Sequence, residues 1–363
     1  MRITDVRVAY LNVPLAPMSP MPVGGETSAH HNLVVVDTDE GLRGIGECFR
    51  LAHEAMATFV ESTLRPMLLG EDPRRIEHLW EKMYGATYRY GRAGLALHAI
   101  SGVEIALWDI LGKSLHAPVY RLLGGATREK IPAYASMHKF AEPAHVAEVA
   151  TRCVGQGYRA VKLHQRDVAS VRAARVALGD DVQLMMDPAG AWNPRDALRV
   201  CTQAAEYGVH WVEEPLTRMD DYEGLRWLRD HSPIRIAAGE NEYTHWGFRD
   251  LIARRAVDVV QPDLIKSGGL LACRRIAALA DAFDLEVSPH SFYYGPGIAA
   301  TLHFCAATAR TQFIEINPHD LEDWFLDPPL RPVDGFVEVP TGPGLGIVVD
   351  EDRLAHALSR PAR

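Results

Sequence analysis

The sequence has few cysteines and no excess of positive charge, and each shortage excludes a class of protein. Its five cysteines are an odd number and lack a CxxC spacing, so we expect reduced packing residues in a cytoplasmic protein. The formal net charge of −9 disfavours a nucleic-acid partner, because phosphate binding needs a basic surface. The expected partner is therefore a small molecule.

Long apolar runs are also missing. The first residues, MRITDVRVAYLNV, alternate like a strand and lack the apolar core of a signal peptide. No apolar run approaches the length that spans a bilayer, so we expect neither secretion nor a membrane association. What remains is an ordinary globular composition, with 47% apolar and 23% charged residues. At 363 residues, an α/β barrel of about 250 residues and a smaller domain both fit.

The N-terminal third predicts a small α+β region. Residues 2–13, 30–37 and 42–49 alternate with period two, and Asp39-Glu40-Gly41 makes a turn, which predicts an antiparallel meander. Its first connection, rich in Pro and Gly, reads equally well as a mobile lid or as a plain surface loop. Residues 54–123 are helical in pattern and end at Gly124-Gly125.

After Gly125, short apolar runs alternate regularly with amphipathic helical segments. The eight runs end near Met137, His164, Asp187, Pro215, Glu240, Asp263, His290 and Asn317. Near-continuous apolar strands separated by helices indicate a parallel sheet, and eight of them close as a barrel. The fold class is therefore α/β. After the last run the chain leaves through a Pro-rich segment, a strand-like FVEVP and a short helix, and we expect this tail to pack on the N-terminal meander.

Three of these strand ends carry carboxylates. Asp187, Glu213 and Glu240 are separated by 213 − 187 = 26 and 240 − 213 = 27 residues, about one strand plus one helix and its loops. All three acids should therefore converge on one rim. Buried carboxylates repel one another unless cations or a metal neutralise them. Carboxylate-only ligation suits Mg²⁺ or Mn²⁺ rather than Zn²⁺.

Further ionisable residues recur at the other strand ends, where barrel active sites are built. They are Lys162, His164, Asp263, His290 and Glu315. Lys162 and His164 are two apart on one strand and face the same side, so we expect Lys162 to keep the imidazole neutral and able to accept a proton. Asp263 would orient His290 through one ring nitrogen, and Glu315, protonated by burial, would bond a substrate oxygen.

Such a rim can ionise a carbon acid. A metal bound to a substrate carboxylate stabilises the negative charge that develops when the α-proton leaves, which gives an enediolate. Loss of a β-hydroxyl then gives dehydration, whereas reprotonation from the other face gives racemisation or epimerisation. The residues leave open whether His164 or His290 is the base.

The chain resembles the mandelate racemase subgroup of the enolase superfamily. Asp187 in DPAG, Glu213 in VEEP and Glu240 in GEN match the family's metal ligands. Asp263 in QPDLIKSGG and His290 in SPHSF match its Asp–His dyad, and Glu315 in FIEIN matches its last-strand acid. The resemblance implies a modified TIM barrel, (β/α)7β, over residues 126–318. An α+β capping domain would form from residues 1–125 and the tail 319–363, with a homo-oligomeric assembly.

The resemblance also implies where specificity arises. It assigns this role to the capping loop from Met18 to His31 and the turn from Cys48 to Leu51. Two departures matter: the usual KxK is Lys162-Leu163-His164, and the usual Asp-x-Asn is Asp187-Pro188-Ala189. Mandelate racemisation is therefore disfavoured, and a missing Asp-x-Asp at Glu315 disfavours dipeptide epimerisation.

The leading hypothesis is a Mg²⁺-dependent lyase, an acid-sugar dehydratase that converts an aldonate or aldarate to a 2-keto-3-deoxy acid. The polar loop residues Glu26, Thr27, Ser28, His30 and His31 suit a sugar acid. A racemase or epimerase and a sugar-lactone cycloisomerase are alternatives within the superfamily. A non-catalytic metal-binding scaffold is the alternative of another class, although it would not need an oriented acid/base pair.

Overall fold

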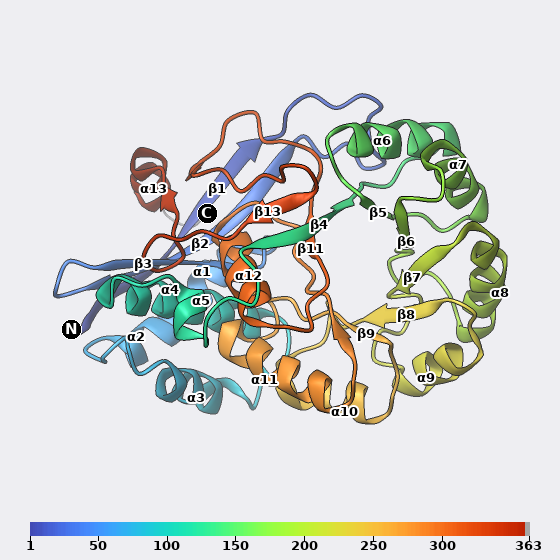
Figure 1. The fold of residues 1–363 in the computed structure, drawn as a ribbon. Coiled ribbons are helices and arrows are strands. Elements are labelled where there is room, and N and C mark those ends of the chain that lie inside the picture. The colour runs from blue at the N-terminus through green and yellow to red at the C-terminus, as the bar shows by residue number, and fades with distance from the viewer. Residues whose placement is uncertain (360–363) are drawn as a thin grey trace.

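The computed structural model describes residues 1–359, and its centre is a barrel of eight parallel strands (Figure 1). The strands are β4 (Lys130–Ser136), β5 (Ala160–Leu163), β6 (Gln183–Met186), β7 (Val209–Glu213), β8 (Arg235–Ala238), β9 (Val259–Val260), β10 (Glu286–Val287) and β11 (Ile314–Ile316). They pair in chain order from β4 to β10, and β11 pairs with β4. A parallel bridge between Val287 and Thr311 completes the ring. The predicted α/β barrel is confirmed.

Seven helices connect these strands and cover the outside of the barrel. They are α6 (Pro143–Gly155), α7 (Val168–Leu178), α8 (Pro194–Ala204), α9 (Tyr222–His231), α10 (Thr244–Ala253), α11 (Gly269–Ala282) and α12 (Pro296–Ala307). Asp167, Asn193 and Asp221 begin α7, α8 and α9, and each side chain accepts a hydrogen bond from an N–H of the first turn. Because helices cover the outer face, the strands are apolar along almost their whole length.

The N-terminal sheet confirms the predicted meander. Its strands β1 (Ile3–Pro14), β2 (Ser28–Thr38) and β3 (Arg43–Cys48) are antiparallel and pair in that order. Strand β2 starts earlier than expected, because Pro14 pairs with Ser28 and the ladder continues from there. Residues 28 and 29, which the sequence pattern left in the connection, therefore belong to a paired strand.

The helices that follow this sheet in the chain complete the N-terminal region. They are α1 (His53–Phe59), a π-helical turn (Val60–Leu64), α2 (Arg65–Leu68), α3 (Ile76–Thr87), α4 (Leu95–Ser114) and α5 (Val119–Leu122). Helix α4 contacts both β3 and the barrel helix α11, so it lies at the core of the molecule.

Helix α4 is long, apolar and mostly buried. Among the described residues it is the one helix that is long and apolar enough to cross a membrane by length and composition. It lies within the helical region predicted over 54–123, and Glu104 and Asp109 interrupt its apolar run. In the structure 89% of this apolar window is buried, as in the core helix of a globular protein.

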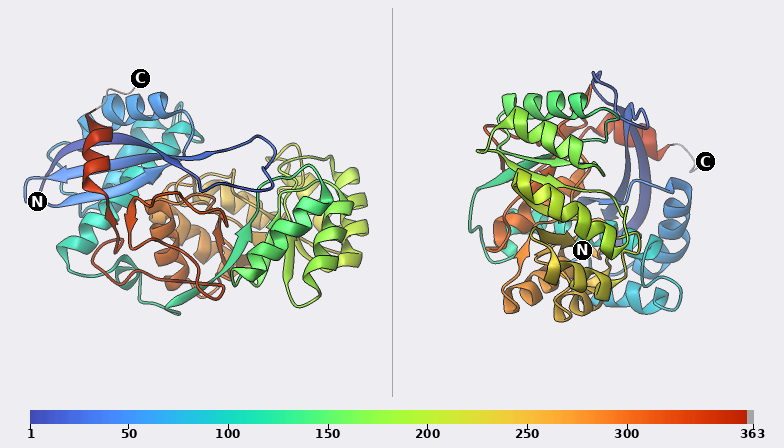
Figure 2. Two further views of the ribbon diagram at one scale, coloured as in Figure 1. Left: turned by 90° about the horizontal axis from the view of Figure 1, so that it is seen from above. Right: turned by 90° about the vertical axis from the view of Figure 1, so that its right-hand side faces the viewer.

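The C-terminal tail divides between the two parts of the molecule. Strand β13 (Phe336–Glu338) pairs antiparallel with β4 of the barrel, whereas β12 (Leu326–Asp327) and β14 (Val348–Val349) pair with each other. The last helix, α13 (Glu351–Leu358), packs on β1, as Figure 2 shows, and the N–H of Glu322 donates to the carbonyl oxygen of Pro14 at the end of the same strand. The tail therefore reaches the meander as expected, through residues 320–322 and α13, whereas FVEVP pairs with the first residues of β4.

Candidate active site

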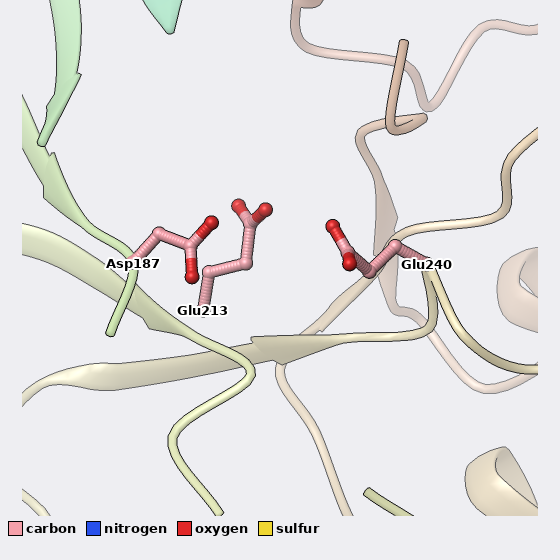
Figure 3. Close-up of side chains that lie close together, drawn as sticks. All are labelled: Asp187, Glu213 and Glu240. Carbon is pink, nitrogen blue, oxygen red and sulfur yellow. The ribbon is translucent and has the colours of Figure 1, made fainter. Parts of the chain in front are cut away.

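Three carboxylates from consecutive strands meet at the carboxyl end of the barrel. Asp187 follows β6, Glu213 is the last residue of β7, and Glu240 lies two residues after β8. One oxygen of each carboxylate lies within 4.8 Å of the others. In Figure 3 the side chains of Asp187 and Glu213 lie next to each other, and Glu240 faces them. The convergence expected from the spacing is present.

Lys162 on β5 is the buried cation of this cluster. Its Nζ lies 2.5 Å from Glu213 Oε1, 2.8 Å from Glu315 Oε1 and 3.7 Å from Asp187 Oδ2. Burial lowers the pKa of Lys162, but these carboxylates raise it well above its ordinary value, so the side chain is an ammonium ion. Lys162 therefore offsets part of the negative charge at the base of the site.

Glu213 is fully buried, and its carboxylate is held by neighbouring side chains. Burial raises its pKa to about 7, and Asp187 adds to this effect while Lys162 opposes it. Its Oε2 accepts a hydrogen bond of 2.6 Å from Gln261 Nε2. The raised pKa measures the cost of crowding carboxylates away from water, a cost that a further cation would reduce.

His164 stands beside Asp187 with its ring orientation defined. Its Nδ1–H donates to the carbonyl oxygen of Met137, and its Nε2 lies 2.9 Å from Asp187 Oδ2. We expected Lys162 to keep this ring neutral. Burial and Lys162 do lower the pKa of His164, but the adjacent Asp187 carboxylate outweighs them and the net pKa is raised. That expectation is wrong, because the ring lies closer to an acid than the strand pattern alone implied.

Asp263 and His290 form the expected hydrogen-bonded pair. His290 Nδ1 lies 2.7 Å from Asp263 Oδ2, which makes it the donor to the carboxylate. The other ring nitrogen, Nε2, lies 3.1 Å from Glu240 Oε2 and 3.8 Å from Glu315 Oε2. Burial lowers the pKa of His290, but Glu240 and Glu315 raise it to about 9. The ring therefore points its free nitrogen at the carboxylate cluster.

Glu315 differs from the expectation of a protonated acid. Burial raises its pKa, but Lys162 and His290 more than compensate and hold the pKa well below its ordinary value. Its Oε2 also accepts a hydrogen bond of 2.9 Å from the backbone N–H of Ser291. Glu315 is therefore an ionised acceptor and not a neutral donor.

A cavity of about 380 Å³ opens onto this cluster. Four of the predicted residues line it, namely His164, Asp187, Glu240 and His290. The other four are fully buried behind its wall, namely Lys162, Glu213, Asp263 and Glu315. Val23, Glu26, Phe49 and Arg50 also line it, so parts of both capping segments reach the cavity.

Several polar side chains of the cavity wall were not predicted from the sequence. They are His138, Lys139, Arg166, Asn241 and Lys266. Each lies within three residues of the end of a predicted strand. Extending the search from strand ends to the first residues of the following loops would have found them, because these loops form the rim of a parallel barrel.

Comparison with known families identifies the class of protein. Residues 3–124 match the mandelate racemase / muconate lactonizing enzyme N-terminal domain, and residues 145–353 match the enolase C-terminal domain-like family. The chain belongs to the enolase superfamily, in its mandelate racemase group, and is an enzyme.

Characterised relatives cover almost the whole chain. It is 34% identical to D-galactarolactone cycloisomerase of Agrobacterium fabrum, over 98% of both chains. It is 32% identical to arabinonate dehydratase of Saccharolobus solfataricus, over 86% of this chain and 87% of that one. The relatives are thus sugar-acid dehydratases and cycloisomerases.

One similar solved structure contains a bound metal ion. A racemase from Streptomyces coelicolor A3(2) with bound magnesium superimposes with a TM-score of 0.86 at 30% identity, covering 98% of this chain and 99% of that one. The cluster of Asp187, Glu213 and Glu240 is chemically suited to the same kind of ion, since all its donors are carboxylate oxygens.

Proposed function

We propose that the protein is a Mg²⁺-dependent dehydratase that converts a sugar acid, an aldonate or aldarate, into a 2-keto-3-deoxy acid. One observation carries this proposal: two imidazoles, His164 and His290, each have Nδ1 held by an acceptor and Nε2 turned to the carboxylate cluster. Two oriented rings on one cluster are what a reaction needs when one proton is removed and another is delivered.

Asp187, Glu213 and Glu240 are the proposed ligands of the ion. The oxygen-only donor set fits Mg²⁺, and Mn²⁺ would be accepted by the same atoms. When bound, the ion offsets the negative charge that develops on the substrate carboxylate as the α-carbon loses its proton. Lys162 supplies fixed positive charge beside two of these ligands and so limits their mutual repulsion.

The chain's own groups then move the protons. One ring accepts the α-proton at Nε2 while its Nδ1–H bond holds it in place. The other ring gives a proton to the β-hydroxyl, the C3–O bond breaks, and water leaves. The enol that results takes a proton at C3, releases the proton of its C2 hydroxyl group and becomes the 2-keto-3-deoxy acid. In this scheme Asp263 stabilises a positively charged His290, and the carbonyl of Met137 orients His164.

The cavity supports a small, hydroxylated and anionic substrate. Its wall carries four cationic side chains besides the site residues, namely Arg50, Lys139, Arg166 and Lys266. Asn241, His138 and Glu26 add uncharged or acidic hydrogen-bonding groups. Several donors and acceptors around about 380 Å³ match an acid with several hydroxyl groups better than an apolar acid.

A sugar-lactone cycloisomerase is the second candidate. The observation that favours it is the 34% identity to D-galactarolactone cycloisomerase over 98% of both chains. The same α-proton abstraction would then expel a ring oxygen of the lactone instead of water. Where no leaving group is present, reprotonation at the α-carbon would give epimerisation.

A substrate panel tests the proposal. Aldonates, aldarates and their lactones would be incubated with the protein and Mg²⁺ in D₂O and followed by NMR. We expect a 2-keto-3-deoxy product from at least one acid. A product from lactones alone would establish the cycloisomerase. Exchange of the α-proton without any keto acid would establish an epimerase or racemase, and no reaction across the panel would contradict all three.

Single substitutions identify the base. We expect His290→Asn and His164→Asn each to lower turnover about 100-fold or more, because each removes one proton transfer. The variant that lacks the base should also lose exchange of the α-proton with D₂O, whereas the variant that lacks the acid should retain it. His116→Asn is the control, since His116 is exposed and its positive φ suits Asn. Normal turnover in both site variants would refute the assignment.

A further inference from the structure

The two residues of the Asp263–His290 pair stand at equivalent places in the chain. Asp263 lies 268 − 263 = 5 residues before Gly268, which begins α11, and His290 lies 295 − 290 = 5 residues before Gly295, which begins α12. Neither glycine has a side chain that could cap its helix. The first N–H groups of both helices therefore need acceptors from elsewhere.

For α11 the acceptors come from helix α4 of the N-terminal region. The N–H groups of Leu270 and Leu271 donate to Glu104 Oε2 and Oε1, at 2.9 and 2.8 Å. The N–H of Gly268 donates to Ser101 Oγ at 2.9 Å. Glu104 is 0% exposed, so its carboxylate makes its hydrogen bonds inside the protein and not with solvent. One turn of α4 thus caps the helix that follows Asp263.

For α12 the acceptor comes from strand β3. Glu47 Oε2 accepts the N–H of Gly297 at 2.8 Å, and Glu47 Oε1 lies 2.7 Å from Nδ1 of His31 on β2. Glu47 and His31 are both 1% exposed. A second buried carboxylate of the N-terminal region thus caps the helix that follows His290.

The glycines allow these approaches. A Cβ added at Gly269 would lie 2.1 Å from Glu104 Oε2, and one added at Gly295 would lie 2.4 Å from Glu47 Oε2. Any other residue would push the carboxylate away from the helix end. Burial raises the pKa of Glu104 to about 7, and the N–H groups of Leu270 and Leu271 oppose this rise.

Short connections couple these helix ends to the dyad. Within the first loop, the N–H of Ile265 donates to Asp263 Oδ1 at 2.8 Å. In the second, the hydroxyl of Tyr293 lies 3.4 Å from Asp263 Oδ1 and 3.2 Å from Thr301 Oγ1 on α12. A shift at the start of either helix is therefore passed to the carboxylate and the imidazole.

We propose that Glu47 and Glu104 are positioning residues for the Asp263–His290 dyad. From the N-terminal region they hold the first turns of α11 and α12, and these turns fix the dyad loops, residues 264–268 after Asp263 and residues 291–295 after His290. The inference rests on the catalytic role proposed above for that dyad. Neither carboxylate touches the cavity, so each acts through the backbone that it holds. The reaction is sensitive to such displacements, since an error of about 1 Å in a reacting group costs roughly 100-fold in rate.

Two variants of similar side-chain length test the proposal. Glu104→Gln sets an NH₂ group against a backbone N–H donor, and Glu47→Met removes the oxygen that accepts the N–H of Gly297. We expect kcat to fall about 10-fold or more in each, with KM changed less than about 3-fold. Hydrogen exchange should quicken at residues 264–271 in the first variant and at 291–297 in the second.

Asp109→Asn is the matched control. Asp109 is also a buried carboxylate of α4 that accepts two backbone N–H groups, from Ile45 at 3.0 Å and Leu345 at 2.9 Å, but it contacts neither dyad loop. This variant should exchange faster near Ile45 and Leu345 while kcat stays within about 2-fold. If either variant at Glu104 or Glu47 folds poorly, a milder substitution replaces it. Ser101→Ala weakens the start of α11, and His31→Gln weakens the start of α12.

The outcomes separate the two proposals. Unchanged hydrogen exchange in the dyad loops, or unchanged kcat despite faster exchange, overturns the positioning role. An equal loss of kcat in Asp109→Asn also overturns it, because the effect would then be general. If the wild-type protein converts no acid or lactone, the proposed function fails instead, and hydrogen exchange alone, which needs no substrate, decides whether Glu47 and Glu104 hold the loops.

Discussion

His303 in α12 is a buried, neutral imidazole that uses both ring nitrogens. Its Nδ1 accepts the N–H of Tyr120 at 3.3 Å, and its Nε2–H donates to the carbonyl of Leu345 at 3.1 Å. Burial lowers its pKa from 6.5 to about 4. If Nδ1 were protonated, its N–H would point at the N–H of Tyr120 and the hydrogen bond would be lost. Protonation is therefore less favourable in the folded state than in the unfolded chain.

This residue should make stability depend on pH. A base whose pKa is lowered by folding stabilises the protein above pH 6.5 and loses that contribution as the pH falls toward 4. We expect wild-type unfolding free energy to drop more steeply over this interval than that of His303→Gln, by about 1.4 kcal/mol per pH unit. Urea unfolding at pH 7, 6, 5 and 4 measures the difference. Parallel pH profiles of the two proteins would contradict the assignment.

At the scale of elements, β3 can approach α4 closely only because of its glycines. A Cβ added at Gly46 would lie 1.9 Å from the carbonyl oxygen of Gly102, and one added at Gly44 would lie 2.2 Å from that of Ala106. Both obstacles are helix backbone, which cannot move aside as a flexible side chain could. The sheet and the core helix would therefore have to separate to admit a methyl group.

We expect Gly46→Ala to destabilise the protein by about 3 kcal/mol, at the upper end of the cost of an added methylene in a packed core. Gly85→Ala is the matched control, because Gly85 is an exposed residue of helix α3 with nothing within 4 Å of the added Cβ. That variant should gain about 0.5–1 kcal/mol from the better helix propensity of alanine. Thermal unfolding compares the two, and a stable Gly46→Ala would refute the close packing.

At the scale of the whole molecule, Mg²⁺ binding should stabilise the fold. The three proposed ligands come from the ends of β6, β7 and β8, so the site exists only when the barrel is assembled. An ion that binds the folded chain alone adds about 2.7 kcal/mol at 100 times its dissociation constant. We expect Tm to rise with the logarithm of the Mg²⁺ concentration and to fall back with EDTA.

Glu240→Gln supplies the control for this measurement. It removes one ligand charge while leaving Asp187 and Glu213 in place, so the Mg²⁺-dependent rise in Tm should shrink or vanish. All samples are brought to the same ionic strength with NaCl, so that a change in Tm reports Mg²⁺ binding and not general screening of charges. A rise of the same size in Glu240→Gln would place the ion elsewhere.

The arrangement of the candidate site was largely predictable from the sequence. Each strand–helix unit takes a similar number of residues, so regular spacing placed Asp187, Glu213 and Glu240 on one rim, and the pairing of Asp263 with His290 followed from neighbouring strands. The domain boundaries and the homo-oligomer stay predictions. The path of β13 was not predictable, because FVEVP suits any exposed edge and carries no signal for its partner.

The sequence by itself determined the alternation of strands and helices and the ends at which ionisable groups stand, because periodicity and spacing are local properties. Only the tertiary structure decided the direction in which the pKa of Glu315 and that of His164 are shifted, since a pKa depends on which charges lie nearby in space. It also decided that Glu47 and Glu104 cap helices 250 and 166 residues further along the chain. Contacts at such separations leave no local pattern, and they form because a buried carboxylate must find donors wherever the fold brings them.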